Sequence, residues 1–300
     1  MRSQRLITIL QALFITFLWS TSWVFIKIGL NDIHIPALTF AGLRYSMAFG
    51  VLLAYGGYTQ RLSNLKTLSR QDWLKLCGLG IVFYTITQGS QFVALTYLPS
   101  ALFSLMLNFT AIVVALAGIQ LLREYPTRIQ WSGMLIFLMG VLIYLHPIYF
   151  PAEMMLGLVV GLISMLANAG GSILGRYINR DHTISPFIVT IVSMGFGAFL
   201  LLGTGLIVED FPPIPLEGWG IIIWLAVVNT AFAFTIWNLT LRTLSATESS
   251  VIMNTMLIQI AVLAWIFLGE TITLQEGIGL GIASVGIFIV QVRRRKSQSV

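Results

Sequence analysis

Tryptophan, tyrosine, amide and hydroxyl side chains recur at helical spacing inside long apolar stretches of this sequence. Residues four apart lie on one face of a helix, so several such faces together can line a binding site for a small solute with an apolar or planar part. Polar groups within such apolar stretches need a hydrogen-bonding partner or a water-filled cavity. Interhelical hydrogen bonding, worth about 0.6 kcal/mol on average, is the alternative role for each residue. The candidate lining residues are Trp19, Trp23, Tyr84, Gln88, Gln91, Asn108, Asn168, Ser172, Trp237 and Asn254.

Three charged residues could act beside these faces. Arg44 lies within an apolar stretch, about nine residues or roughly 13 Å from its end at 1.5 Å per residue. An arginine at that depth pairs with a solute carboxylate, extends toward the surface or holds backbone carbonyls. Glu124 and Glu270 stand just before Thr127-x-x-Gln130 and Thr273-x-x-Glu276, which are signatures of capping boxes. These two carboxylates either shape a tight connection between helices, which we favour, or gate access.

Several kinds of chemistry are not expected. Cys77 is the only cysteine, so an intrachain disulfide and a cysteine-based metal site are excluded. The histidines His34, His146 and His182 are far apart and fall in predicted loops, and no catalytic pair lies within an apolar stretch. We therefore predict no metal, no cofactor and no enzyme activity. The basic tail Arg293–Lys296 follows an apolar stretch, which favours lipid headgroups over nucleic acid as its partner.

The elements that must position these residues are membrane-spanning helices. Of the 300 residues, 57% are apolar and 9% charged, whereas soluble chains have about 25% charged residues. A spanning helix needs about 20 predominantly apolar residues. Apolar runs interrupted by proline, glycine and charge predict ten such helices, near 6–28, 35–57, 74–95, 99–121, 128–145, 155–175, 186–208, 219–240, 247–268 and 275–292.

Basic residues set the expected orientation. With ten crossings, 15 of the 17 lysines and arginines fall on the side of the N-terminus, while Lys27 and Arg44 do not. The opposite side carries acidic residues, among them Asp32, Glu153 and Glu209. Positive charge marks the cytoplasmic face, so both termini are predicted to be cytoplasmic, in a multi-pass protein of the cell (inner) membrane.

The sequence also repeats itself. Residues 95–144 and 241–290 share 12 identities in 50 aligned positions at a fixed offset of 146. The offset spans five predicted helices, an odd number, so the two copies have opposite orientations in the membrane. An inverted repeat is typical of carriers that bind substrate near the midplane. The identical pairs include Ser104/Ser250, Asn108/Asn254, Glu124/Glu270, Thr127/Thr273, Gly133/Gly279 and Gly140/Gly286.

These repeated residues resemble the EamA-type family of the drug/metabolite transporter superfamily. The similar stretches are 122–127 through Gly133 and Gly140, and 268–273 through Gly279 and Gly286. The opening run 18–27 and the Leu43-Arg44-Tyr45 stretch fit the family as well. The family often has a proline near 110–111 and 256–257, which this chain lacks. The resemblance implies transport of small organic solutes, frequently export of amino acids or other metabolites.

Glycines indicate which helices form the scaffold. Gly133 and Gly140 are seven residues apart, as are Gly279 and Gly286, and Gly277-x-x-x-Gly281 adds a further small-residue pair. Such glycines let helices approach closely, so the fifth and tenth helices are predicted to be structural.

The sequence thus predicts an all-α membrane protein with ten transmembrane helices in two inverted five-helix repeats, 1–147 and 152–300. Its expected function is export of neutral or aromatic amino acids by alternating access. Export of nucleosides or cationic compounds, or a channel or lipid scramblase, is the alternative. No acidic residue lies deep in a predicted helix, which favours a facilitator or exchanger unless Glu124, Glu248 or Glu270 couples protons. The expected partners are a small-molecule substrate, the bilayer and a second copy in a homodimer, without nucleic acid.

Overall fold

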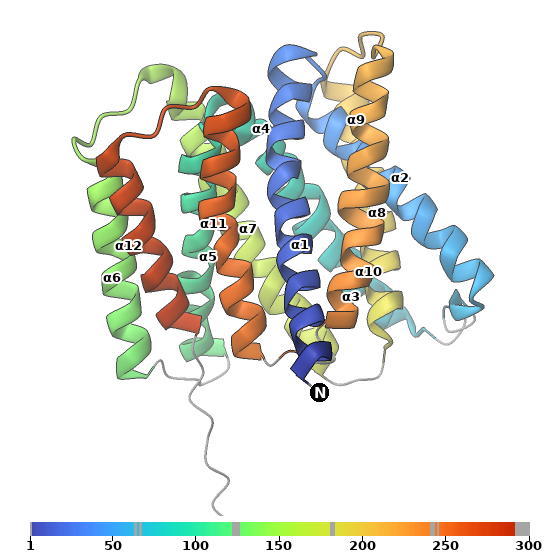
Figure 1. Cartoon of the computed structure of the whole chain (residues 1–300). Helices are drawn as coiled ribbons and strands as arrows, with labels where there is room; N and C mark the ends of the chain where they lie inside the picture. The colour runs from blue at the N-terminus through green and yellow to red at the C-terminus, as the bar shows by residue number, and fades with distance from the viewer. Residues whose placement is uncertain are drawn as a thin grey trace, which may run out of the picture.

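The computed structural model is a bundle of helices that run up and down between two ends (Figure 1). It describes residues 2–62, 65, 68–121, 127–180, 184–240, 244 and 246–291. We refer to the end at which α1 begins, at the bottom of Figure 1, as the N-terminal end. Within these residues the helices are α1 (Arg2–Lys27) with η1 (Ile28–Asp32), α2 (Ala37–Tyr58), α3 (Arg70–Leu79) with η3 (Gly80–Gln88) and α4 (Gly89–Tyr97), α5 (Ser100–Leu121), α6 (Arg128–Leu145), α7 (Ala152–Arg180), α8 (Pro186–Val208), α9 (Leu216–Ala226) with η4 (Val227–Phe232) and α10 (Ala233–Thr240), α11 (Ala246–Leu268) and α12 (Leu274–Gln291).

The ten predicted segments each correspond to one continuous helical segment of the described chain. Several helices extend past the apolar run that predicted them, because capping and charged residues continue a helix beyond the apolar run. Ser69 and Asp72 form a capping box that starts α3 four residues before the predicted beginning. The predicted capping boxes at Thr127 and Thr273 are confirmed by hydrogen bonds to Gln130 and Glu276.

Length and composition support membrane insertion for much of the bundle. Six helices of the described chain are long and apolar enough to cross a membrane, namely Leu6–Asp32, Ala37–Tyr58, Ser100–Ala117, Arg128–Leu145, Ala152–Asn179 and Pro186–Val208. Three shorter apolar helices, Leu216–Phe232, Ile252–Leu268 and Leu274–Val290, lie beside them.

Helices at equivalent positions of the repeat pack antiparallel against each other. We refer to α1–α6 as the first half and to α7–α12 as the second half. The last helices of the two halves, α6 and α12, lie side by side at the left of Figure 1. A Cβ added at Gly133 would lie 2.7 Å from the Val290 nitrogen, and one at Gly140 would lie 2.7 Å from the Gly279 oxygen. Residue numbers rise along α6 as they fall along α12, so the helices are antiparallel.

The predicted scaffold role of these glycines is confirmed, because only glycine fits such backbone contact. Gly277 and Gly281 differ: a Cβ at either would meet nothing within 4 Å, so the prediction that this pair brings helices together is wrong. The second helices of the halves, α2 and α8, also pack antiparallel, with Gly42 against Leu202 and Gly205 against Thr39.

Buried apolar side chains are connected differently at the two ends of the bundle. Away from the N-terminal end, one cluster of buried residues joins α1, α2, α4 and α5 to α8, α9 and α11. At the N-terminal end, the described side chains form two separate clusters. One joins α3, α7 and α8, and the other joins α1, α10 and α11. A further cluster joins α5, α6, α11 and α12. Among the described side chains, one large cluster thus links the two halves away from the N-terminal end, whereas the two clusters at the N-terminal end are not joined to each other.

Candidate functional site

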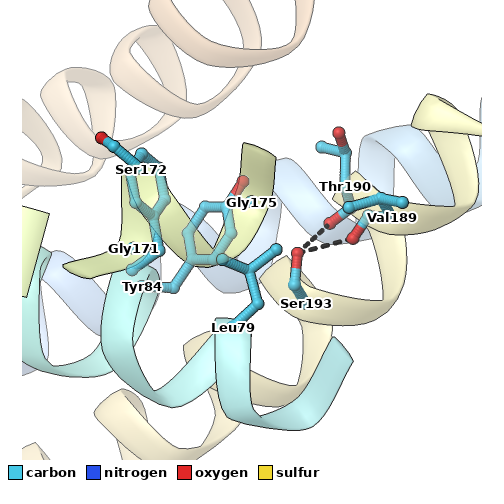
Figure 2. Close-up of a pocket in the computed structure, with 9 residues that line it drawn as sticks. Leu79, Tyr84, Gly171, Ser172, Gly175, Val189, Thr190 and Ser193 are labelled. Carbon is cyan, nitrogen blue, oxygen red and sulfur yellow. Dashed lines mark hydrogen bonds between the residues drawn. The ribbon is translucent and has the colours of Figure 1, made fainter. Parts of the chain in front are cut away.

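A cavity of about 350 Å³ lies between α3, η3, α7 and α8, toward the N-terminal end of the bundle. Figure 2 shows its walls, with Gly171 and Gly175 on α7 facing Tyr84 and Leu79. Cavities of about 300–1,000 Å³ hold small organic ligands. Its nine lining residues are Leu79, Phe83, Tyr84, Gly171, Ser172, Gly175, Val189, Thr190 and Ser193.

Glycine on α7 makes room for this cavity. A Cβ at Gly171 would lie 2.6 Å from the Phe83 ring, so only glycine allows η3 to approach α7 at this point. At Gly175, one turn further, a Cβ would lie 3.8 Å from Leu79, so space remains beside the helix. α7 and α8 each pack against η3, and the cavity occupies the corner between the three.

The walls of the cavity are uncharged. Ser172 is exposed and offers a hydroxyl group, whereas the half-buried Thr190 hydroxyl donates to the Pro186 carbonyl at 3.0 Å. The Ser193 hydroxyl is already committed, because it donates to the Val189 carbonyl at 2.6 Å and lies 3.4 Å from the Thr190 carbonyl (Figure 2). Such a lining suits a neutral solute with an apolar or aromatic part.

Tyr84 connects the cavity to a polar cluster on α2 and η3. Its ring meets the Tyr45 ring edge to face, with centroids 5.7 Å apart. The Tyr45 hydroxyl donates to Gln88 Oε1 at 2.7 Å. Tyr84 and Gln88, which the spacing of η3 predicted to share a face, therefore both contact Tyr45.

Arg44 directly precedes Tyr45 on α2, and its side chain is 6% exposed. Its Nε and Nη2 atoms each lie 3.3 Å from the Thr230 hydroxyl on η4, and its guanidinium lies 5.2 Å from the centroid of the Tyr45 ring. The alternative in which Arg44 extends to the surface is wrong, because α9 and η4 cover this part of α2. Its hydrogen-bonding partner is a hydroxyl group and not a backbone carbonyl.

A second polar cluster joins α1 to η4 and α10. The rings of Trp19 and Trp237 lie 5.3 Å apart, and Trp19 Nε1 donates to the Asn229 carbonyl at 3.0 Å. The Asn229 amide donates to the Ser22 hydroxyl at 2.9 Å and to the Leu18 carbonyl. These hydrogen bonds hold the middle of α1 against the eighth helical segment.

The remaining predicted lining residues are dispersed. Asn168 donates to the Thr110 hydroxyl at 3.3 Å across α7 and α5, and Asn108 donates to the Ser104 carbonyl of its own helix at 2.8 Å. Trp23 is buried, with its ring 5.5 Å from that of Phe103, and Gln91 is half-buried on α4. The Nδ2 atom of Asn254 is buried without a hydrogen-bonding partner. Of the ten predicted residues, Tyr84 and Ser172 line the cavity itself.

Acidic residues hold the bundle together at the end away from the N-terminus. Glu270 accepts hydrogen bonds from the backbone nitrogens of Ser100 at 2.8 Å and Ala101 at 3.4 Å, at the start of α5. Glu209, at the end of α8, accepts in the same way from Leu38 and Thr39 at 2.8 Å each. Both carboxylates belong to the second half and cap helices of the first half. Glu124 and the side chain of Glu248 lie outside the described residues.

Three π-helical segments of the described chain, η1, η3 and η4, were not predicted from the sequence. η3 and η4 occur at equivalent places in the third and eighth helical segments, and both contribute to the polar clusters. In each, a threonine hydroxyl donates to the carbonyl five residues earlier, Thr87 to Val82 and Thr230 to Leu225, at 2.8 Å. Such bulges are frequent at functional sites. No group of three or more histidine, cysteine or acidic side chains in the described chain could hold a metal ion.

Comparison with known proteins places the chain in a family. The profile of the EamA-like transporter family matches residues 6–145 and 155–292. An uncharacterized transporter of Archaeoglobus fulgidus is 23% identical over 93% of this chain and 95% of its own length. A probable amino-acid metabolite efflux pump of Salmonella typhimurium is 25% identical over 93% of this chain and 92% of its own length. A protein known from a crystal structure has the same fold, with a TM-score of 0.68 and 16% identity over 97% of this chain and 98% of that one. This chain therefore belongs to the EamA-like transporter family, whose members are multi-pass membrane transporters.

Proposed function

We propose that this transporter exports neutral or aromatic amino acids across the inner membrane by alternating access. In this proposal all ten helical segments span the membrane, both termini are cytoplasmic, and 1–147 and 152–300 are the two inverted repeats. The observation that carries the proposal is the cavity at the N-terminal end. The two buried clusters at that end are separate, whereas at the other end one large cluster joins helices of both halves. Such an arrangement is that of a carrier open to one side.

The chemistry of the walls supports the substrate class. The cavity offers aromatic rings, small residues and hydroxyl groups without a charged side chain. Similarity to two probable amino-acid metabolite efflux pumps, from Salmonella typhimurium and Escherichia coli, is in accord with it. Substrate would enter beside Ser172 and pass toward Trp19, Trp23, Gln88, Asn108 and Asn254 as the halves rock.

Exchange in proteoliposomes tests this proposal. Vesicles loaded with one unlabelled amino acid are assayed for uptake of each labelled amino acid, with nucleosides and cationic compounds as comparison solutes. We expect saturable uptake of neutral or aromatic amino acids that is stimulated by internal substrate and indifferent to a pH gradient. Uptake that does not saturate would contradict a carrier, and exchange confined to nucleosides or cations would contradict the substrate class.

A further inference from the structure

The nine residues that line the cavity have counterparts in the other half of the repeat. α2 begins at Ala37 and α8 at Pro186, an offset of 149, whereas α3 begins at Arg70 and α9 at Leu216, an offset of 146. The first offset also aligns Lys27 of α1 with Arg176 of α7. We subtract 149 from the cavity residues on α7 and α8 and add 146 to those on α3 and η3. The counterparts are Ser22, Trp23, Ile26, Phe40, Ala41, Arg44, Leu225, Asn229 and Thr230.

Contacts in the structure agree with this correspondence. In the cavity, Gly171 of α7 packs against the Phe83 ring of η3. Their counterparts, Ser22 of α1 and Asn229 of η4, are joined by a hydrogen bond of 2.9 Å. This pair of contacts is what inverted copies of one arrangement, at opposite ends of the bundle, would give.

The counterpart residues are packed against one another, whereas the residues of the cavity leave a space between them. None of the nine is more than 7% exposed, and Ile26, Phe40, Leu225, Asn229 and Thr230 are fully buried. The space that Gly171, Ser172 and Gly175 leave free is occupied in the other half by the larger Ser22, Trp23 and Ile26. When a carrier with an inverted repeat changes state, each half adopts the arrangement of the other, so these residues separate in the opposite state.

The two sets differ in chemistry at two positions. Arg44 takes the place of Ser193, and Asn229 takes the place of Phe83. Within the described chain, the guanidinium of Arg44 hydrogen-bonds only to the Thr230 hydroxyl, although it carries five N–H donors. Asn229 Oδ1 is fully buried and accepts no hydrogen bond. Asn229 is next in sequence to Thr230, the partner of Arg44. A buried cation without an anionic partner and an unfilled acceptor on the adjoining residue are matched by a ligand that has a carboxylate and an N–H group.

We propose that these residues form a second substrate pocket, open in the opposite state, in which Arg44 binds the α-carboxylate and Asn229 Oδ1 accepts from the α-ammonium group of an amino acid. The proposal rests on the proposed function and adds a position that distinguishes zwitterionic from uncharged solutes. Arg44 then selects for the carboxylate on the side away from the N-terminus, whereas Ser193 at the equivalent place near the N-terminus makes no such selection.

The test compares an amino acid with its carboxamide as transported solutes. Uptake is measured from the side away from the N-terminus for the unmodified protein, Arg44→Gln, Arg44→Lys and the equivalent-position control Ser193→Ala. We expect Arg44→Gln to lower amino-acid uptake at least tenfold and carboxamide uptake less than twofold. Arg44→Lys, which keeps the charge, should recover part of the preference, and Ser193→Ala should leave it unchanged.

Two results would overturn the assignment of Arg44. Arg44→Gln could lower uptake of both solutes equally, as a purely structural role predicts, or could leave the preference intact. Folding is monitored by the thermal unfolding midpoint. If Arg44→Gln does not fold, Arg44→Lys decides: a weakened but retained preference for the amino acid supports the assignment, and a complete loss of that preference contradicts it. Failure of the unmodified protein to exchange any amino acid would instead contradict the proposed function, so the two failures are distinguishable.

Discussion

The two ends of the bundle are built from equivalent residues and differ in whether they are packed. Near the N-terminus, small residues of α7 leave a cavity against η3 and α8, and the described core is split into two clusters. At the other end, Trp23, Phe40 and Arg44 fill the corresponding space, and two carboxylates cap helices of the other half. One repeated framework thus holds a cavity at one end and a packed counterpart at the other, as the proposed alternating access requires.

The largest expected effect concerns the close contact between α6 and α12. Gly140→Leu places a side chain against the α12 backbone, where even a Cβ would lie 2.7 Å from the Gly279 oxygen. Overpacking of this kind costs about 1–3 kcal/mol or more. We expect the thermal unfolding midpoint of the purified protein to fall by about 5 °C or more, as 1 kcal/mol shifts it by a few degrees.

Gly281→Leu is the matched control for that substitution. It lies on α12 as well, but a Cβ there meets nothing within 4 Å, so the midpoint should change little. Equal effects of the two variants would show that α6 and α12 are not held together by backbone contact.

The next largest effect is expected from a substitution that fills the cavity and so makes the two ends alike. Gly175→Leu adds a side chain inside it, while Gly170→Leu adds the same side chain on the exposed surface of α7. A Cβ at either position would lie 3.8 Å from its nearest neighbour, so both should fold. We expect a tenfold or greater loss of uptake for Gly175→Leu alone, measured in proteoliposomes. Similar uptake by both variants would place the transport route outside the cavity.

A smaller effect is expected from loosening the closed end. Glu270→Gln removes the charge that caps α5, and a hydrogen bond to a charged group contributes about 1.5–3 kcal/mol compared with about 1 kcal/mol for a neutral one. The closed end should therefore open several times more often, and a cysteine placed at Ser22 should react correspondingly faster from that side. Glu276→Gln is the control, since Glu276 caps only its own helix at the same end. A reaction rate that Glu270→Gln leaves unchanged would show that this carboxylate does not contribute to closure.

The smallest effect concerns a polar contact near the middle of the bundle. Ser20 donates to Gln259 Oε1 at 2.9 Å and thereby joins α1 to α11. Interhelical hydrogen bonds in membranes average about 0.6 kcal/mol, so Gln259→Leu should lower the unfolding midpoint by about 1–3 °C. A drop as large as that expected for Gly140→Leu would mean that polar contacts, and not glycine packing, hold the frame.

Apolar runs were sufficient to predict the ten helical segments and their order. Runs of about 20 apolar residues have one stable conformation in lipid, and proline, glycine and charge end them. The glycines of α6 and α12 could be predicted as contacts because they recur in both halves at the same spacing. The prediction that Gly277 and Gly281 form a helix contact was wrong, because spacing alone does not determine which face of α12 meets a neighbour.

The cavity could not be predicted from residue type, because it forms where glycines of α7 have no side chain to fill the space. Gly171 and Gly175 carry no chemistry of their own, and Val189 and Leu79 are ordinary apolar residues. The π-helical segments were equally hidden, since they depend on how the third and eighth helical segments rotate. The orientation of each helix about its own axis likewise decided that Asn168 bonds to Thr110 and that Arg44 meets Thr230.

The difference between the two ends is tested most directly by labelling one cysteine at each. Ser172→Cys and Ser22→Cys are introduced separately into a Cys77→Ser protein, and each is exposed to an impermeant thiol reagent from either side of sealed vesicles without substrate. Ser172 is exposed in the cavity wall and Ser22 is 4% exposed in its closed counterpart. The account predicts fast labelling of Ser172→Cys from the N-terminal side only, and slow labelling of Ser22→Cys from both sides. Fast labelling of Ser22→Cys, or protection of Ser172→Cys from the N-terminal side, would contradict it.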